Sequence, residues 1–103
     1  MPSELQRLLS APLSLKSLWA IQSAALEVAD EVSEPLAYFL VASIAGSIAG
    51  RMEGGPVSAE AAQVRDEIVR PALADIVAAA ETSDTGRLVT AANSAIRGFL
   101  LSQ

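Results

Sequence analysis

Four carboxylates follow one another at helical spacing, and they are the residues of this chain whose chemistry is easiest to name: Glu27, Asp30, Glu31 and Glu34. Side chains three or four residues apart lie on one face of a helix. Carboxylates grouped in this way can hold Mg²⁺ together with water molecules. A magnesium-dependent hydrolase is therefore one hypothesis. A solvent-exposed helix face explains the same spacing, and it is the interpretation we favour, so we expect no metal site.

The end of this acidic segment resembles a motif of the all-α nucleoside-triphosphate pyrophosphohydrolases of the MazG kind, which carry glutamate pairs and an E-x-x-D step on facing helices. Glu31-x-x-Glu34, followed by Leu36 and Tyr38, is similar to the second step. The resemblance covers about a tenth of the chain. Glu34 stands where that family has Asp, Pro35 follows it directly, and no paired-glutamate motif lies upstream. The resemblance implies a magnesium-dependent nucleotide hydrolase as an alternative function.

The chain contains no histidine and no cysteine. It therefore lacks the usual general base and the commonest transition-metal ligand. It also lacks any thiol nucleophile, thiolate metal site or disulfide. No glycine-rich phosphate-binding pattern occurs in the sequence either. We therefore expect a protein that is not an enzyme and that uses no cofactor.

Two polar residues, Gln22 and Arg65, fall near the middle of otherwise apolar helix faces. A buried polar side chain needs hydrogen-bond partners, and an unpaired guanidinium is costly to bury. Arg65 is thus a candidate for pairing with a carboxylate or for lining a small anion pocket. The alternative is that its long stem carries the charge to the surface.

The segment expected to form the third helix, residues 35–52, is apolar on two sides. Its small side holds Ala42, Ala45, Gly46, Ala49 and Gly50, and its bulky side holds Leu40, Val41, Ile44 and Ile48. A helix apolar on both sides must be covered on both sides. The spacing Ala42-x3-Gly46-x3-Gly50 permits close approach of another helix. That helix belongs either to the same chain or to a partner, and the pattern leaves both alternatives open.

Capping residues, apolar periodicity and breaks at glycine or proline divide the chain into helices. Ser3 is expected to cap a short helix that Pro12 ends, and Ser14 a longer one reaching about residue 32. After the third helix, Ser58 begins a fourth that reaches about residue 82 with a kink at Pro71, and a fifth spans about 85–101. The sequence predicts one all-α domain over residues 1–103: an antiparallel bundle of four main helices with a short N-terminal helix.

Helical spacing also predicts which side chains enter the core. The expected inner face of the second helix is Leu15, Leu18, Trp19, Ala25, Leu26, Ala29 and Val32. The expected inner face of the last helix is Leu88, Val89, Ala92, Ala95, Ile96, Phe99 and Leu100. Among the few aromatic residues, Trp19 and Phe99 are expected to be core anchors.

The net charge and the length of the uncharged segment indicate which kinds of partner the chain is expected to lack. The net charge is −5 and the seven basic residues are scattered, so we expect no nucleic-acid partner. The uncharged run from Leu36 to Gly50 is about fifteen residues, shorter than the roughly 20 of a membrane-crossing helix, so no span is expected. The first residues lack the basic and apolar regions of a signal peptide, and we expect a cytoplasmic protein.

Taken together, these features favour a non-enzymatic interaction or assembly protein. We expect a homodimer, or a small regulatory subunit that docks on a protein partner through the small-residue face of the third helix. Two alternatives remain: the magnesium-dependent hydrolase, and a carrier that holds a small apolar ligand between the third and last helices.

Overall fold

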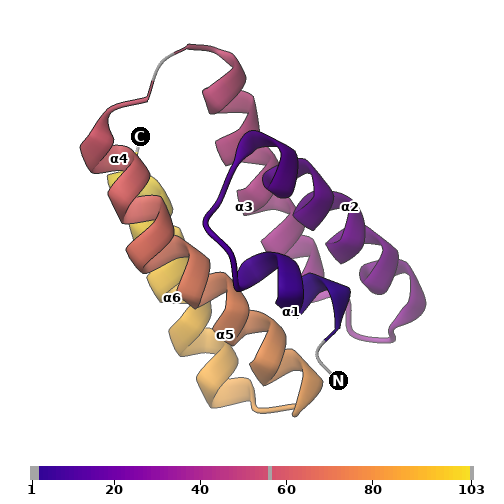
Figure 1. Cartoon of the computed structure of the whole chain (residues 1–103). Coiled ribbons are helices and arrows are strands. Elements are labelled where there is room, and N and C mark those ends of the chain that lie inside the picture. The colour runs from indigo at the N-terminus through magenta and orange to yellow at the C-terminus, as the bar shows by residue number, and fades with distance from the viewer. Residues whose placement is uncertain (1–2, 56, 103) are drawn as a thin grey trace.

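The computed structural model describes residues 3–55 and 57–102, which form helices joined by short turns, with no strand among them. The elements are α1 (Glu4–Leu9), α2 (Leu15–Glu31), α3 (Leu36–Glu53), α4 (Ala59–Val64), the π-helical turn η1 (Arg65–Val69), α5 (Arg70–Glu81) and α6 (Thr85–Leu101). Because α4, η1 and α5 form one continuous rod, there are four main helices and a short leading one (Figure 1). The predicted all-α bundle is confirmed.

Side-chain caps fix where the helices begin. The Ser3 hydroxyl accepts a hydrogen bond from the backbone N–H of Gln6 at 3.1 Å, and Ser14 does the same for Ser17 at 3.1 Å. Ser58 and Asp84 cap α4 and α6 in the same way. Each cap satisfies one of the backbone N–H groups that have no partner within the first turn of a helix.

The rod formed by α4, η1 and α5 passes through Pro71 without ending, as predicted. The backbone N–H of Arg70 donates to the carbonyl of Arg65, five residues back, so the chain widens into a π-helical turn just before the proline. Pro71 has no N–H to donate and its ring crowds the preceding turn. The wider turn accommodates the ring, and the helix continues as α5.

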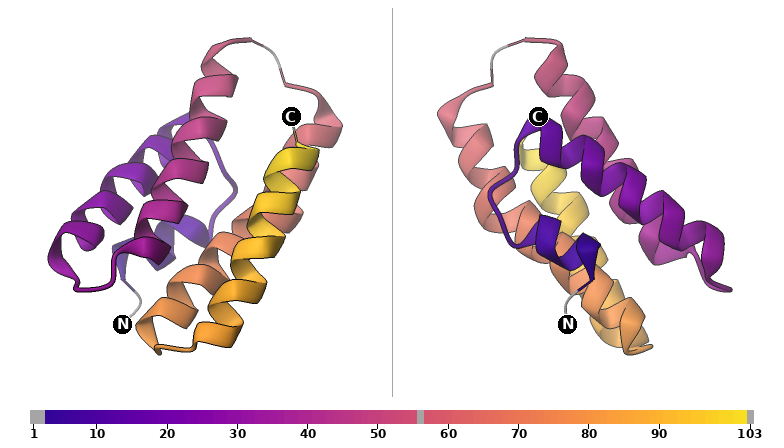
Figure 2. Two further views of the ribbon diagram at one scale, coloured as in Figure 1. Left: turned by 180° about the vertical axis from the view of Figure 1, so that it is seen from behind. Right: turned by 45° about the vertical axis from the view of Figure 1, so that its right-hand side comes forward.

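The main helices form two antiparallel hairpins, α2 with α3 and α5 with α6. These hairpins pack so that α3 and α6 run parallel as neighbours on the side turned away from the viewer in Figure 1 (Figure 2). The short α1 lies against α2 and α5 on the opposite side. The core is therefore enclosed by α1 on one side and by α3 and α6 on the other.

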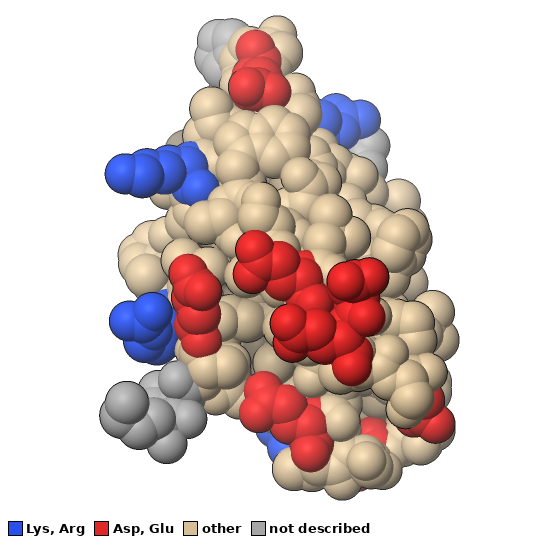
Figure 3. All heavy atoms as spheres, turned by 90° about the vertical axis from the view of Figure 1, so that its right-hand side faces the viewer, with Lys and Arg blue, Asp and Glu red and all other residues tan. Residues whose placement is uncertain are grey.

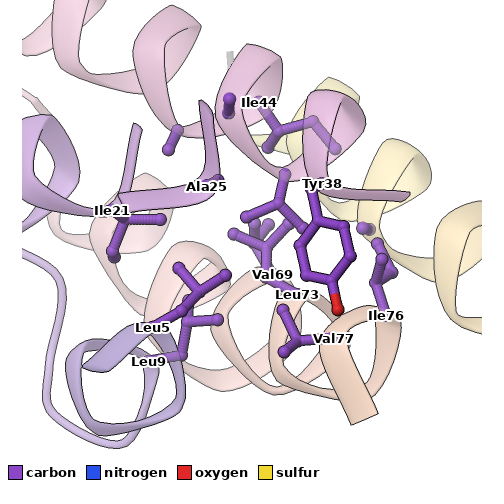
Figure 4. Close-up of a cluster of buried hydrophobic side chains, with 14 of the residues drawn as sticks. Leu5, Leu9, Ile21, Ala25, Tyr38, Ile44, Val69, Leu73, Ile76 and Val77 are labelled. Atoms are coloured by element: carbon purple, nitrogen blue, oxygen red, sulfur yellow. The ribbon is translucent and has the colours of Figure 1, made fainter. Parts of the chain in front are cut away.

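Aliphatic side chains from every layer fill this core (Figure 4). The largest of the fully buried ones are Leu9, Leu18, Ile21, Ile48, Leu73 and Ile76. Burying one such side chain contributes about 1.5–3 kcal/mol to folding. The only tyrosine, Tyr38, lies among them with its ring directed toward α5.

The predicted inner faces of α2 and α6 are partly wrong. Eight of the fourteen predicted residues are buried or pack against the core: Leu15, Leu18, Ala25, Ala29, Leu88, Ala92, Ala95 and Phe99. The other six are exposed. In α2 the buried residues are Leu18, Ile21, Ala24 and Ala25, whereas Trp19 is 37 % exposed and is not a core anchor. In α6 the buried residues are Ala91, Ala95 and Gly98, and Phe99 is only partly buried. Gly98 lets Ile68 and Val69 of η1 approach α6 closely, and Val89, Ile96 and Leu100 lie on another side of the helix.

Candidate functional site

The small face of α3 packs within the chain. Ala42, Ala45 and Ala49 are buried, and α2 is the principal neighbour of α3. A Cβ added at Gly46 would overlap the Gln22 amide nitrogen, so this glycine makes room for the Gln22 side chain of α2. The sequence left open whether a helix of the same chain or of a partner covers this face. For the three alanines, the covering helix belongs to the same chain. Gly50 alone among the five small residues is exposed.

Arg65, the other polar candidate, is buried at the junction of α4 and η1 and does not reach the surface. Its Nη2 donates to the Ser102 carbonyl at 3.4 Å, and its Nε has no partner. Burial first, and the charge of Arg51 second, lower the pKa of Arg65 from its ordinary value. Arg51 is exposed near the end of α3, so two guanidinium groups influence each other at this end of the bundle.

The four carboxylates singled out in the sequence are all exposed: Glu27, Asp30, Glu31 and Glu34. Within residues 3–55 and 57–102, no three acidic, histidine or cysteine side chains are placed to hold a metal ion. Figure 3 shows the side of the molecule on which α2 lies, and acidic side chains gather on its lower half. The geometry there is that of a solvated acidic surface.

A different surface stands out on the solvent side of α3. From Leu36 to Gly50, its exposed residues in order are Leu36, Phe39, Ser43, Ser47 and Gly50. Leu36 is 75 % exposed and Phe39 59 % exposed. No charged residue interrupts α3 between Leu36 and Gly50. This side of α3 is therefore apolar and uncovered at its beginning, and small and uncharged toward its end.

The neighbouring helix α6 extends this surface. Val89 is 53 % and Leu100 63 % exposed, and Ile96 lies between them on the same side of the helix. Gly98 faces η1, whereas Leu88 packs against the core and lines one pocket with Leu36. The side of α6 that carries Val89, Ile96 and Leu100 therefore points the same way as the exposed side of α3.

The helix α2 extends it on the other flank. Gln22 borders Gly46 of α3, and Trp19 and Leu26 lie one helical turn before and after Gln22, on the same edge. We call the combined surface the outer face. It consists of Trp19 and Leu26 from α2, the five exposed residues of α3 from Leu36 to Gly50, and Val89, Ile96 and Leu100 from α6.

The two ends of the outer face differ in charge. At the end where α3 begins, the turns between α2 and α3 and between α5 and α6 enclose a surface pocket of about 590 Å³ whose lining includes Glu34, Asp84, Leu36 and Leu88. At the other end, Arg51 follows Gly50 directly, and Glu53, which is also exposed, is the last residue of α3. The face is thus apolar where α3 begins and small and uncharged toward its end, with acidic residues at the first end and one charge of each sign at the other.

Comparisons of the chain with protein-family models, with curated proteins and with solved structures find no match. No helix in the described part of the chain has the length and apolar character needed to cross a membrane.

Proposed function

We propose that this protein is a non-enzymatic interaction module that docks onto a protein partner through the outer face. One observation carries the proposal: seven large apolar side chains lie exposed on one side of three neighbouring helices. They are Trp19, Leu26, Leu36, Phe39, Val89, Ile96 and Leu100. Exposed apolar side chains scattered singly are ordinary, whereas a contiguous group marks an interaction surface.

The composition of the outer face supports a protein partner. Interfaces are depleted of charge at their centre and enriched in aromatic residues, with polar groups at the rim. Phe39 and the uncharged Ser43 lie at the centre of the outer face, while Glu34 and Arg51 lie at its two ends. Burying apolar surface of this kind stabilises a complex by roughly 25 cal/mol per Å² before the costs of association.

Neither alternative function gains support of equal weight. The four carboxylates are exposed and form no metal-ligating group within the described residues. The pocket at the end of α3 has a volume within the usual range of small-ligand sites, about 300–1,000 Å³. It opens at the end of the outer face and shares Leu36 with it, so we treat the pocket as part of the docking surface.

Site-specific photo-cross-linking in the producing cells tests the proposal. A photoreactive amino acid at Phe39 or Ile96 should give one discrete covalent adduct. The same amino acid at Glu60, an exposed residue of α4, should give none. If the two outer-face positions give no adduct, or give the same diffuse products as Glu60, the outer face is not a docking surface.

A further inference from the structure

We infer that the outer face binds a second copy of this chain, with the two α3 helices face to face and antiparallel. This inference rests on the proposed function, because it names the partner of the same surface. Three features carry it: the spacing and sizes of the exposed side chains of α3, the charges at the two ends, and the extent of the face.

Between Leu36 and Gly50, the exposed positions of α3 are symmetric about Ser43. Residues 36, 39, 43, 47 and 50 are separated by steps of three, four, four and three. A two-fold axis that passes Ser43 at right angles to α3 pairs equal steps on the two copies. It therefore places Leu36 opposite Gly50 of the second copy and Phe39 opposite Ser47.

The sizes of the side chains fit this pairing, because bulky residues meet small ones. Gly50 is the most informative position: a Cβ added there meets no atom of the chain within 4 Å. Glycine inside a helix costs about 1 kcal/mol relative to alanine. Gly46 and Gly98 have close neighbours within the chain, Gln22 and Ile68 respectively. Gly50 has no such neighbour within the chain. Leu36 of a second copy, placed opposite Gly50, explains why a glycine stands here.

The charges oppose a parallel pairing. Glu34 precedes α3, and Arg51 and Glu53 lie exposed in its last turn. A parallel arrangement would bring each of these charges to its own counterpart, and like charges across an interface are costly. The antiparallel arrangement instead brings Glu34 to the end of the second copy that holds one charge of each sign.

The extent of the outer face is sufficient for a dimer. From Leu36 to Gly50 the helix rises about 21 Å, and three neighbouring helices about 10 Å wide give a flat area on the order of 600 Å². Stable interfaces bury about 800 Å² of accessible surface on each partner. Because accessible surface is rougher than a flat projection, the outer face is close to this size.

Light scattering on the purified protein tests the identity of the partner. The expected mass is twice the 10.7 kDa of one chain. Phe39→Glu places a charge at the centre of the face and should yield monomers with an unchanged helical circular dichroism spectrum. Ser94→Glu, on the exposed side of α6 that lies away from the outer face, should leave the dimer intact. A wild-type protein that is monomeric at millimolar concentration overturns the inference.

Because the chain has no cysteine, single cysteines report the geometry directly. Ser43→Cys should form a disulfide-linked dimer on mild oxidation, since Ser43 faces itself across the axis. Ser47→Cys should not, because the two copies of residue 47 are offset by about 12 Å along the helix, beyond disulfide reach. A mixture of Ser47→Cys and Phe39→Cys chains should link. If Ser47→Cys links to itself as fast as Ser43→Cys, the pairing is parallel and the inference fails.

Cross-linking in cells and light scattering on the purified protein together distinguish the docking function from the identity of the partner. A monomeric purified protein that still gives a discrete adduct from Phe39 in cells, at a mass other than two chains, retains the docking function and loses the second copy. A monomeric protein with no adduct at Phe39 or Ile96 loses both.

Discussion

The inner and outer sides of α3 have opposite surroundings. The inner side packs Ile48 and three alanines against the rest of the bundle, whereas the outer side leaves Leu36 and Phe39 uncovered. Intramolecular packing covers both apolar sides that the sequence predicts for this helix, since Ala45 on one side and Val41 on the other are buried. It leaves Leu36 and Phe39 uncovered on a third side.

The largest expected contrast comes from truncating one residue on each side. Ile48→Ala removes a fully buried side chain and should lower the free energy of unfolding by about 2–5 kcal/mol. Phe39→Ala removes a larger ring from a site that is mostly exposed, and should change it by about 0.5 kcal/mol or less when the chain is monomeric.

Urea denaturation at micromolar concentration measures both variants. Equal losses of stability would mean that the outer side of α3 is covered within the chain, contrary to the structure. At high protein concentration, the losses in unfolding free energy of the two variants should become more similar, because Phe39 then contributes through its contact with the second copy.

The helices themselves could be predicted from the sequence because their signals are local. Ser3, Ser14 and Ser58 cap helices where their types predicted, and Pro71 lies inside a helix that continues. A cap is one hydrogen bond between residues three apart, so it needs no knowledge of the rest of the fold.

The outer face could not be predicted in the same way, because hydrophobic periodicity does not say which neighbour covers a stripe. Val89, Ile96 and Leu100 form a clean apolar stripe on α6, and the sequence assigns them to the core. The structure packs α6 through Ala91, Ala95 and Gly98, with Leu88, Ala92 and Phe99 beside them. Gly98 lies against Ile68 and Val69, so the inner face of α6 is centred nearer its small residues than the periodicity predicts.

Gly98 marks the inner contact of α6 and gives the second contrast. A Cβ at this position would lie 2.8 Å from Ile68 Cγ2 and 3.0 Å from Val69 Cγ2. Both neighbours are β-branched and stiff, so they cannot swing aside. Gly98→Ala should therefore destabilise the protein by about 1–3 kcal/mol through overpacking, despite the gain in helix propensity. A melting temperature at or above that of the wild type would show that η1 is not packed closely on α6.

Gly50 gives the smaller, opposite effect. Like Gly98 it is a glycine within a helix, but it lies on the outer side of α3, and no atom of its own chain lies near an added Cβ. Gly50→Ala should stabilise the monomer by about 0.4–1 kcal/mol by restricting the unfolded chain. Thermal unfolding at low concentration, compared with Gly98→Ala, measures the difference in sign. Destabilisation of the monomer by Gly50→Ala would reveal an intramolecular contact at this position.

The adjacent aromatic residues Tyr38 and Phe39 give the finest contrast, in pH dependence. Burial first, and the charge of Glu81 second, raise the pKa of Tyr38 above its ordinary value. The folded state therefore favours the neutral phenol. Its stabilising contribution is fully present below the unfolded pKa of about 10 and is lost as pH rises through the higher folded pKa. The unfolding free energy of the wild type should fall across this alkaline window, and that of Tyr38→Phe should fall less.

Moving the phenol to the outer side of α3 tests whether burial causes the raised pKa of Tyr38. In a Tyr38→Phe/Phe39→Tyr double variant, the only tyrosine occupies an exposed position beside the same turn of α3. Its ultraviolet titration at low concentration should give a pKa close to the ordinary value of about 10, below that of wild-type Tyr38. If the two titrations coincide, desolvation does not distinguish the two sides of α3 at this end. If the double variant titrates higher at dimer-forming concentrations, the outer side is desolvated only by the second copy, and this is the result that the antiparallel pairing requires.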